Sequence, residues 1–395
     1  PSTALGGTGI KTYNDQTYYA ICGSTSGTFT FSNTSTTSST NTNYNITWGN
    51  GNPNYSANTF TSTTQTYSTG VYTLNYSVTG GNGCISTSEK KVFVGSNPSI
   101  GTSNPGSTSV CTGQTLTFPI NDATNNTPGT TYTVNFHDGT APSVFTHPAP
   151  VNVSHTYLLN SCGINSLTYS NSFYVSIVAS NACETSTGFA APIYVSNAPV
   201  ADFSISPSSP VCVNTVVNFT GNATSIKVAS NSGCANSQSI WSITPATGWA
   251  LQSGSVLGID NGFNDPSLWT TPGSNNLSVR FTAAGTYTIK LKVANSTNCG
   301  FDEITKTICV NPTPTATFTV DQTTGCNNLL VKTTNTSSAP SCGVNTYNWS
   351  VSYSAASGCT PSTSLFNYVT GISSTSENPE FSFVNPGTYT ISLVV

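Results

Sequence analysis

One strand-like segment recurs along this chain of 395 residues, and the repetition restricts the fold more than any other feature of the sequence. Large apolar residues alternate with polar ones at a period of two, the pattern of a β-strand with one face on a core and the other in water. The four copies lie at 70–78 (GVYTLNYSV), 173–177 (FYVSI, the degenerate copy), 285–293 (GTYTIKLKV) and 387–395 (GTYTISLVV). A tandem array of all-β domains is therefore predicted.

Two further elements precede each copy and set the domain organisation. A cysteine opens each repeat, and an aromatic strand of period two follows it. The cysteines are Cys22, Cys111, Cys212 and Cys326, and the aromatic strands carry Trp48, Phe136, Trp241 and Trp349. Repeats of this length are whole domains. Pro-rich joints at 97–98, 197–199 and 311–314 give domains 1–97, 98–197, 198–311 with a long insert, and 312–395. We expect the fourth domain to be truncated and the parent chain to be longer.

Composition excludes several classes of function. The chain has 9 basic and 13 acidic residues and a net charge of -4, which offers nothing to nucleic acid. No apolar run is long enough to span a bilayer. All three histidines fall in one domain and acids are sparse, so we predict no enzyme, no cofactor and no metal; Asp138 lacks the acidic neighbours that a calcium site needs. His155 is expected to hold a turn by hydrogen bonding.

Twelve cysteines without a C-x-x-C pair indicate disulfides rather than zinc sites, and hence an extracellular location. Hydrophobic residues make up 36% of the chain, enough to build folded cores.

The aromatic strands resemble the signature of PKD (polycystic kidney disease) domains. YNITWGNG (44–51) and YTVNFHDG (132–139) are similar to Y-x-W-x-F-G-D-G, and His155-Thr156-Tyr157 is similar to the later H-x-Y. Repeats three and four depart from the pattern, with inserts at 244–276 and 352–379 in place of G-D-G. The resemblance implies immunoglobulin-like β-sandwiches in a linear rod.

Tandem PKD domains with these cysteines look most like giant cell-surface proteins of Bacteroidota, including gliding-motility adhesins and appendages exported by type IX secretion. The resemblance implies a non-catalytic structural or adhesive segment at the cell surface. Its partners would be neighbouring domains of the same chain or further copies in a filament. The alternative is an accessory stalk or carbohydrate-binding region of a secreted hydrolase.

Four aromatic and aliphatic residues in the third insert are candidates for binding a surface glycan: Trp249, Phe263, Leu268 and Trp269. Loop aromatics of this kind make ligand contacts, but the competing interpretation is that the insert packs on its own sandwich. Trp48, Trp241 and Trp349 lie in the central strand and are expected in the core.

Strand direction constrains the disulfides. In a Greek-key sandwich the cysteines before the second strand lie at the bottom, and Cys84, Cys183 and Cys299, after the Tyr strand, lie at the top. A strand separates the two ends by roughly 30 Å, too far for a bridge, which needs Cα atoms within about 7 Å. Within domains we therefore expect Cys111–Cys162, Cys212–Cys309, Cys234–Cys299 and Cys326–Cys359, with Cys342 paired beyond Val395. Cys22 and Cys183 remain and are predicted to join domains one and two.

Overall fold

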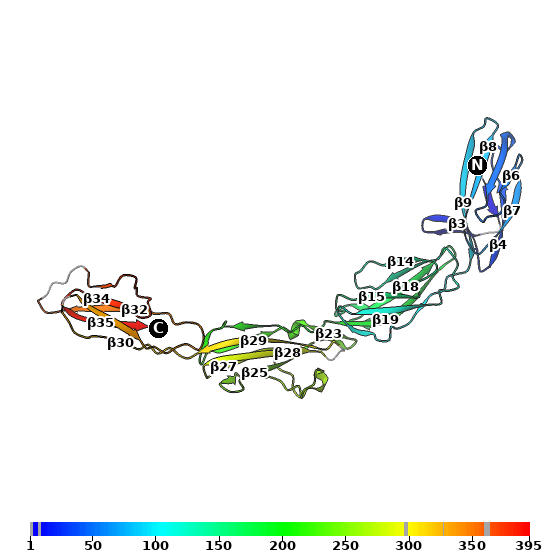
Figure 1. Cartoon of the computed structure of the whole chain (residues 1–395). Helices are drawn as coiled ribbons and strands as arrows, with labels where there is room; N and C mark the ends of the chain where they lie inside the picture. Colours follow the sequence, from blue (N-terminus) through cyan, green and yellow to red (C-terminus); the bar gives the residue numbers. More distant parts are fainter. Residues whose placement is uncertain (1–2, 7–8, 296–298, 327, 359–363) are drawn as a thin grey trace. The chain divides into compact units, whose positions relative to one another are not determined.

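The computed structural model describes residues 3–6, 9–295, 299–326, 328–358 and 364–395 (Figure 1). Strands account for nearly all of its regular structure, and within these ranges there is no α-helix and no helix that could span a membrane. The all-β, tandem immunoglobulin-like fold is therefore confirmed. Three short 3-10 helices are η1 (Ser38–Thr40), η2 (Ala223–Ser225) and η3 (Pro266–Leu268).

The chain forms two compact units. Unit 1 contains the described residues of Pro1–Ala198 and Lys227–Asn236 together with Cys299, and unit 2 contains the described remainder. Each unit holds two pairs of sheets, and each pair encloses its own hydrophobic core. We call the four pairs the first to fourth sandwiches.

The first sandwich packs a sheet of order β1-β4-β7 against one of order β2-β3-β9-β8-β5-β6. Its strands are β1 (Thr3–Gly6), β2 (Gly9–Tyr13), β3 (Gln16–Cys22), β4 (Ser26–Asn33), β5 (Asn41–Thr47), β6 (Tyr55–Ala57), β7 (Ser62–Ser68), β8 (Gly70–Gly80) and β9 (Ile85–Gly95).

The second sandwich has sheets of order β10-β12-β15 and β11-β19-β18-β13-β14, with a small β16-β17 hairpin. Its strands are β10 (Gly101–Thr102), β11 (Ser109–Cys111), β12 (Thr115–Asn121), β13 (Thr131–Asn135), β14 (Ser143–Thr146), β15 (Asn152–Thr156), β16 (Asn165–Ser166), β17 (Tyr169–Ser170), β18 (Phe173–Ser180) and β19 (Thr185–Ser196).

The third sandwich has sheets of order β20-β22-β27-β26 and β21-β29-β28-β25. Its strands are β20 (Phe203–Ser206), β21 (Val211–Cys212), β22 (Val216–Gly221), β25 (Gln238–Thr244), β26 (Trp249–Leu251), β27 (Asn276–Phe281), β28 (Gly285–Ala294) and β29 (Phe301–Asn311). A separate hairpin, β23 (Lys227–Ser230) and β24 (Gly233–Asn236), belongs to unit 1.

The fourth sandwich has a sheet of order β30-β31-β34-β33 and a two-stranded sheet, β32-β35. Its strands are β30 (Phe318–Val320), β31 (Leu329–Asn335), β32 (Asn348–Ala355), β33 (Phe366–Tyr368), β34 (Glu380–Phe383) and β35 (Gly387–Val394).

The repeated Tyr segment forms β8, β18, β28 and β35, and its alternation sets the core. In β28, Tyr287, Ile289 and Leu291 point inward and are at most 2% exposed. The Tyr287 hydroxyl donates to the backbone oxygen of Ala283 (3.0 Å), so the ring fills the core while its polar end closes the preceding turn. Trp241 of β25 packs edge-on against Phe203 at 5.2 Å between ring centroids. The tryptophans expected in the cores are buried.

Candidate functional site: the disulfide-linked joints

The bonded cysteines among the described residues link each sandwich to the next one along the chain. At the first joint, Cys22 ends β3 and Cys183 lies in the turn between β18 and β19, and they form a disulfide with Cα atoms 5.8 Å apart. Cys183 is buried in a small cluster with Ala20, Phe93 and Ala182. Strand direction predicted this pairing, because the bottom of one sandwich faces the top of the next.

Tyr13 adds a second contact across the first joint. It lies on β2, in the β2-β3 hairpin that precedes the first sandwich's core strands. Its hydroxyl donates to the backbone oxygen of Ser180 (2.8 Å) and shares a hydrogen bond of 2.5 Å with the Thr131 hydroxyl. Each such bond contributes about 1 kcal/mol net, so the tyrosine supports the bridge rather than replacing it.

Asparagine side chains bind the linker backbone at the first joint. The Asn126 amide accepts from the Ser99 backbone nitrogen and donates to the Ser99 backbone oxygen, both at 2.7 Å. Asn181 donates to the Ser96 oxygen (3.1 Å), and its own side-chain oxygen accepts from the Cys183 nitrogen (2.9 Å). The backbone groups of Ser96 and Ser99, on either side of the linker, are therefore bound by protein, which removes freedom that a fully solvated linker would keep.

The hairpin of β23 and β24 forms the second joint within unit 1. Cys234 of β24 is bonded to Cys162, with Cα atoms 5.7 Å apart, and Cys299 is bonded to Cys111, with Cα atoms 5.4 Å apart. Asn197 follows β19 and binds the hairpin twice: its backbone nitrogen donates to the Lys227 oxygen (2.8 Å), and its side-chain oxygen accepts from the Lys227 nitrogen (2.9 Å).

The third joint lies within unit 2 and again combines a disulfide with an asparagine that binds backbone groups. Cys309 is bonded to Cys342, with Cα atoms 6.3 Å apart. Asn311, the last residue of β29, accepts from the Cys342 backbone nitrogen (3.0 Å) and donates to the Cys342 backbone oxygen (3.1 Å). Asn197 and Asn311 stand at equivalent places before the joints. The sequence signal for this role is an asparagine one or two residues before a linker proline, and the motifs above do not include it.

Four disulfides expected from the sequence are wrong or fall outside the structure. Cys111–Cys162 and Cys234–Cys299 are replaced by Cys111–Cys299 and Cys162–Cys234, because each cysteine reaches across the joint rather than back into its own sandwich. Cys309 bonds Cys342 instead of Cys212, since the register of β21 and β29 places Asn311 opposite Cys212. The expectation that Cys342 pairs beyond Val395 is wrong as well, because Cys342 is bonded to Cys309.

The expected Cys326–Cys359 pair involves Cys359, which lies outside the described residues. Among the described cysteines, Cys84, Cys212 and Cys326 are exposed thiols.

The aromatic candidates in the third insert divide into two kinds. Trp269 is 8% exposed and its indole donates to the Phe263 oxygen (2.9 Å), while the Trp249 indole donates to the Pro245 oxygen (2.8 Å) and the ring packs on the third core. Phe263 and Leu268 remain about half exposed, at 47% and 53%. The two tryptophans thus hold the insert in place, as the competing interpretation expected.

An ion pair between a buried lysine and a partly exposed aspartate anchors the insert. The Lys292 ammonium on β28 lies 2.8 Å from Asp260 and also donates to the Phe263 oxygen (2.9 Å). The hydrogen bond from Lys292, followed by one from the Gly262 backbone, lowers the pKa of Asp260. The Lys292 side chain is only 8% exposed, so its charge would be costly without these partners.

The His155–Asp138 pair fixes a turn in the second sandwich. Nε2 of His155 lies 2.7 Å from Asp138, the His155 ring stacks on Phe136 at 3.9 Å, and Asp138 accepts from the Thr140 backbone and hydroxyl. Burial would raise the pKa of Asp138, but the hydrogen bonds from Thr140 and His155 outweigh it and lower the pKa. The described residues contain no cluster of three or more His, Cys, Asp or Glu placed to hold a metal.

Comparison with known proteins yields similar folds and no family. No family model matches the chain, and no curated protein matches it. Solved structures that are similar include three N-terminal domains of the highly immunogenic outer capsid protein of bacteriophage RB49 (13% identity over 75% of this chain and 91% of that one, TM-score 0.30).

A second is the N-terminal eight Ig domains of Down syndrome cell adhesion molecule (10% identity over 100% of this chain and 47% of that one, TM-score 0.35). A third is an I-band fragment of titin (11% identity over 73% of this chain and 90% of that one, TM-score 0.28). The chain spans about half the length of the cell adhesion molecule fragment.

Proposed function

We propose that the chain is a non-catalytic structural segment of an extracellular adhesin or appendage, in which disulfides lock consecutive domains together. The observation that carries this proposal is that all four disulfides among the described residues join one sandwich to the next. A disulfide that stabilises a single domain closes a loop inside that domain. Bridges across joints instead restrict how domains move against each other, which is useful where a chain must transmit tension.

The interleaving of the bridges makes the proposal measurable. Residue 111 lies inside the segment closed by Cys22–Cys183, and residue 183 lies inside the segment closed by Cys111–Cys299. The shortest covalent path from residue 22 to residue 299 then runs through both disulfides and along the backbone between Cys111 and Cys183, and contains about 72 residues. A fully extended residue spans about 3.5 Å, so reduction should release roughly 200 residues, or about 700 Å of contour length.

Single-molecule pulling on the chain tests this directly. Without reductant, the segment between residues 22 and 299 should stop extending about 700 Å short of its reduced length. Equal extension with and without reductant would show that the bridges do not bear tension, and would overturn the proposal.

The domain division is part of the proposal: domains 1–97, 98–197, 198–311 and 312–395. The four separate hydrophobic cores support it. The hairpin of β23 and β24 follows the proposed boundary at residues 197 and 198, yet it belongs to unit 1. In this division the hairpin is a part of the third domain that packs against the second.

The finer identity that we propose is the PKD-like kind found in Bacteroidota surface proteins, exported by the type IX route and used in adhesion or gliding. The motif residues 44–51, 132–139 and 155–157 support it, as does the His155 contact to Asp138 within that motif. The complete gene tests it: many further copies and a sorting domain would support the adhesin, and an adjoining catalytic domain would support the stalk of a hydrolase instead.

A further inference from the structure

A chain of hydrogen bonds connects the first joint to a histidine of the second sandwich. Asn126, which binds both backbone groups of Ser99 beside the linker, also donates a hydrogen bond of 2.9 Å to the hydroxyl of Tyr132. That hydroxyl lies 3.0 Å from Nδ1 of His147, the residue that follows β14. Asn126 and Tyr132 are buried, whereas His147 is partly exposed and can exchange protons with solvent.

The neighbours of each group determine the direction of these hydrogen bonds. The Asn126 oxygen accepts from the Ser99 nitrogen, so the Asn126 amino group is the donor to both the Ser99 oxygen and the Tyr132 hydroxyl. The hydroxyl therefore accepts one bond, and its own proton needs an acceptor. Burial raises the pKa of Tyr132, so that proton stays in place near neutral pH. Nδ1 of His147 is the acceptor that faces it, which requires a neutral ring with its proton on Nε2.

Protonation of His147 removes this acceptor. Both ring nitrogens then donate, and the hydroxyl of Tyr132, a residue that is 0% exposed, is left without an acceptor. A buried donor without a partner costs the free energy of its desolvation. If the Asn126 amide turns over instead, the hydroxyl gains an oxygen, but the Asn126 amino group then faces the Ser99 nitrogen and both bonds to Ser99 are lost. Either response weakens the contact at the joint.

The other asparagine of the first joint is connected to the same histidine. The His147 backbone nitrogen donates to the Thr130 oxygen (2.9 Å), and the Thr130 hydroxyl accepts from Asn181 (3.2 Å). Asn181 also donates to the Ser96 oxygen on the other side of the linker (3.1 Å). Both asparagines that hold the joint therefore bind a residue that itself binds His147.

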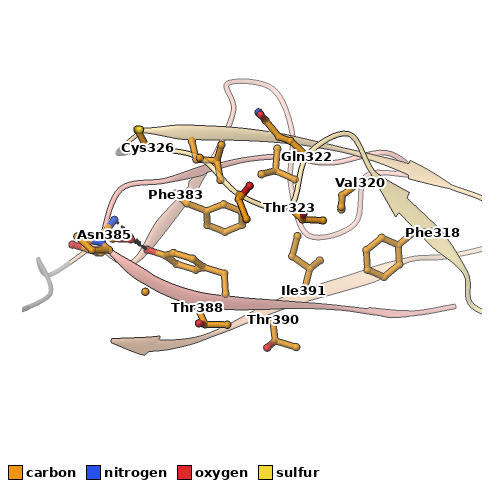
Figure 2. A pocket seen from close by; sticks show the side chains of 17 residues that line it. Phe318, Val320, Gln322, Thr323, Cys326, Phe383, Asn385, Thr388, Thr390 and Ile391 are labelled. Atoms are coloured by element: carbon orange, nitrogen blue, oxygen red, sulfur yellow. Dashed lines mark hydrogen bonds between the residues drawn. The ribbon is translucent and has the colours of Figure 1, made fainter. Parts of the chain in front are cut away.

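Tyrosines of other sandwiches donate to backbone oxygens, which do not titrate in this pH range. In the first sandwich Tyr44 occupies the same place in the repeat; its hydroxyl accepts from Asn41 (3.1 Å) and donates to the Ser38 oxygen (3.2 Å). In the fourth the Tyr389 hydroxyl donates to the Asn385 oxygen (3.1 Å), and Figure 2 marks hydrogen bonding beside Asn385 with a dashed line. The titratable acceptor distinguishes the second sandwich from these two.

The surroundings of His147 contain few other titratable groups. Tyr132 contacts its ring, and β13, β14 and residues 123–130, which adjoin it, carry no charged side chain. In the turn between β18 and β19 the acid is Glu184, whose carboxylate accepts from the next backbone nitrogen (3.3 Å). None of the ion pairs among the described residues includes His147. Its protonation therefore acts through the Tyr132 hydroxyl.

We propose that protonation of His147 loosens the first joint, because the neutral ring keeps Asn126 oriented toward Ser99 and the protonated ring does not. The tight form binds one proton fewer, so its stability is present at high pH and is lost as pH falls through the range of about 8 to 5 in which imidazoles titrate. The Cys22–Cys183 bridge does not titrate, so in mild acid the joint stays covalently closed and gains freedom. This regulation rests on the proposed function of the joints.

Hydrogen exchange at the Ser99 amide, measured at residue resolution on the whole oxidised chain, tests the proposal. Its protection factor, which corrects for the intrinsic effect of pH on exchange, should fall at least about fivefold between about pH 7.5 and about pH 5.5, the effect of one unpaired buried hydroxyl. Amides in β18 should keep their protection, because the change is local. Long-range nitrogen–proton NMR should find the proton of His147 on Nε2 at the higher pH.

Three variants separate this chain of hydrogen bonds from other effects of pH. Tyr132→Phe removes the hydroxyl but leaves both bonds between Asn126 and Ser99, so the Ser99 amide should stay protected at both pH values. His147→Asn supplies an acceptor that does not titrate and should give the same result. His137→Asn is the matched control; His137 binds Ser176 beyond the opposite end of β13, and the variant should keep the pH dependence of the native chain.

Three results would each overturn the proposal: equal protection of the native chain at both pH values, a fall in protection that persists in Tyr132→Phe, or a neutral His147 with its proton on Nδ1. None of them would change the extension measured on reduction, because all four disulfides stay in place in these variants. Failure of this inference is therefore distinguishable from failure of the proposed function.

Discussion

Removing the Cys22–Cys183 bridge gives the sharpest test of what a joint contributes. The variant is Cys22→Ala with Cys183→Ala, since alanine leaves no new polar group in the buried cluster around Cys183. When the first sandwich alone unfolds, the bridge holds a loop that runs from Cys22 to the joint near Asn97, about 75 residues. The loop-closure relation for that length gives about 4 kcal/mol at 25 °C.

This magnitude translates into a large thermal shift. A domain of about 100 residues loses roughly 4–8 °C of Tm for each kcal/mol, so the transition of the first sandwich should fall by about 15–30 °C in differential scanning calorimetry. Cys84→Ala removes an exposed thiol from the same sandwich and serves as the matched control. If the double variant shifted no further than this control, constraint of the unfolded chain would not explain the bridge, and the physical account of the joints given above would fail.

Four further outcomes are expected. Gly129→Ala should destabilise the first joint by about 1–3 kcal/mol, because an added Cβ would lie 2.2 Å from Val71; Gly139→Ala, at the same φ of 93° with open space around it, is the control in a denaturant titration. The second sandwich should lose stability in acid. The lowered pKa of Asp138 gives stabilisation that is present above the unfolded value near 3.9 and is lost as pH falls through the folded value; Asp138→Asn should flatten this limb of a stability–pH curve. Trp269→Ala should lower the stability of the third sandwich by about 3–5 kcal/mol and leave binding to a glycan array unchanged. A selective loss of glycan binding would instead support the insert as a glycan-binding site. Alkylation of the native chain followed by peptide mapping should label Cys84, Cys212 and Cys326, and label on any of the eight bonded cysteines would contradict the disulfide assignment.

The strands were predictable because a period of two is a local property of the sequence. Tyr287, Ile289 and Leu291 alternate with polar residues, and a two-layer sandwich is the arrangement that buries such a face. Strand direction also placed Cys22 and Cys183 at facing ends. Strand direction shows at which end of a sandwich a cysteine lies, but not which cysteine it faces there. It therefore predicts partners for Cys111 and Cys234 inside their own domains, whereas both bond across the joint.

Other features depend on contacts between segments that are distant in sequence. Nothing local to 227–236 shows that this hairpin packs against the second sandwich, where Ala229 donates a backbone hydrogen bond to the Ser196 hydroxyl at 3.0 Å. The roles of Asn197 and Asn311 follow from geometry at the joint, although their position before proline was visible. The packing of Trp269 depends on Lys292 and Asp260, which the sequence separates by 32 residues.

Bridging every joint by sulfur also changes what a protease can do to this chain. A cut between residues 97 and 98 leaves its two products tied through Cys22–Cys183, one between 197 and 198 leaves two ties, and one between 311 and 312 leaves the Cys309–Cys342 tie. A single nick in one of these linkers therefore releases no fragment in an oxidising environment. A molecule of this kind tolerates single cuts in its linkers and comes apart there only when cleavage and reduction occur together.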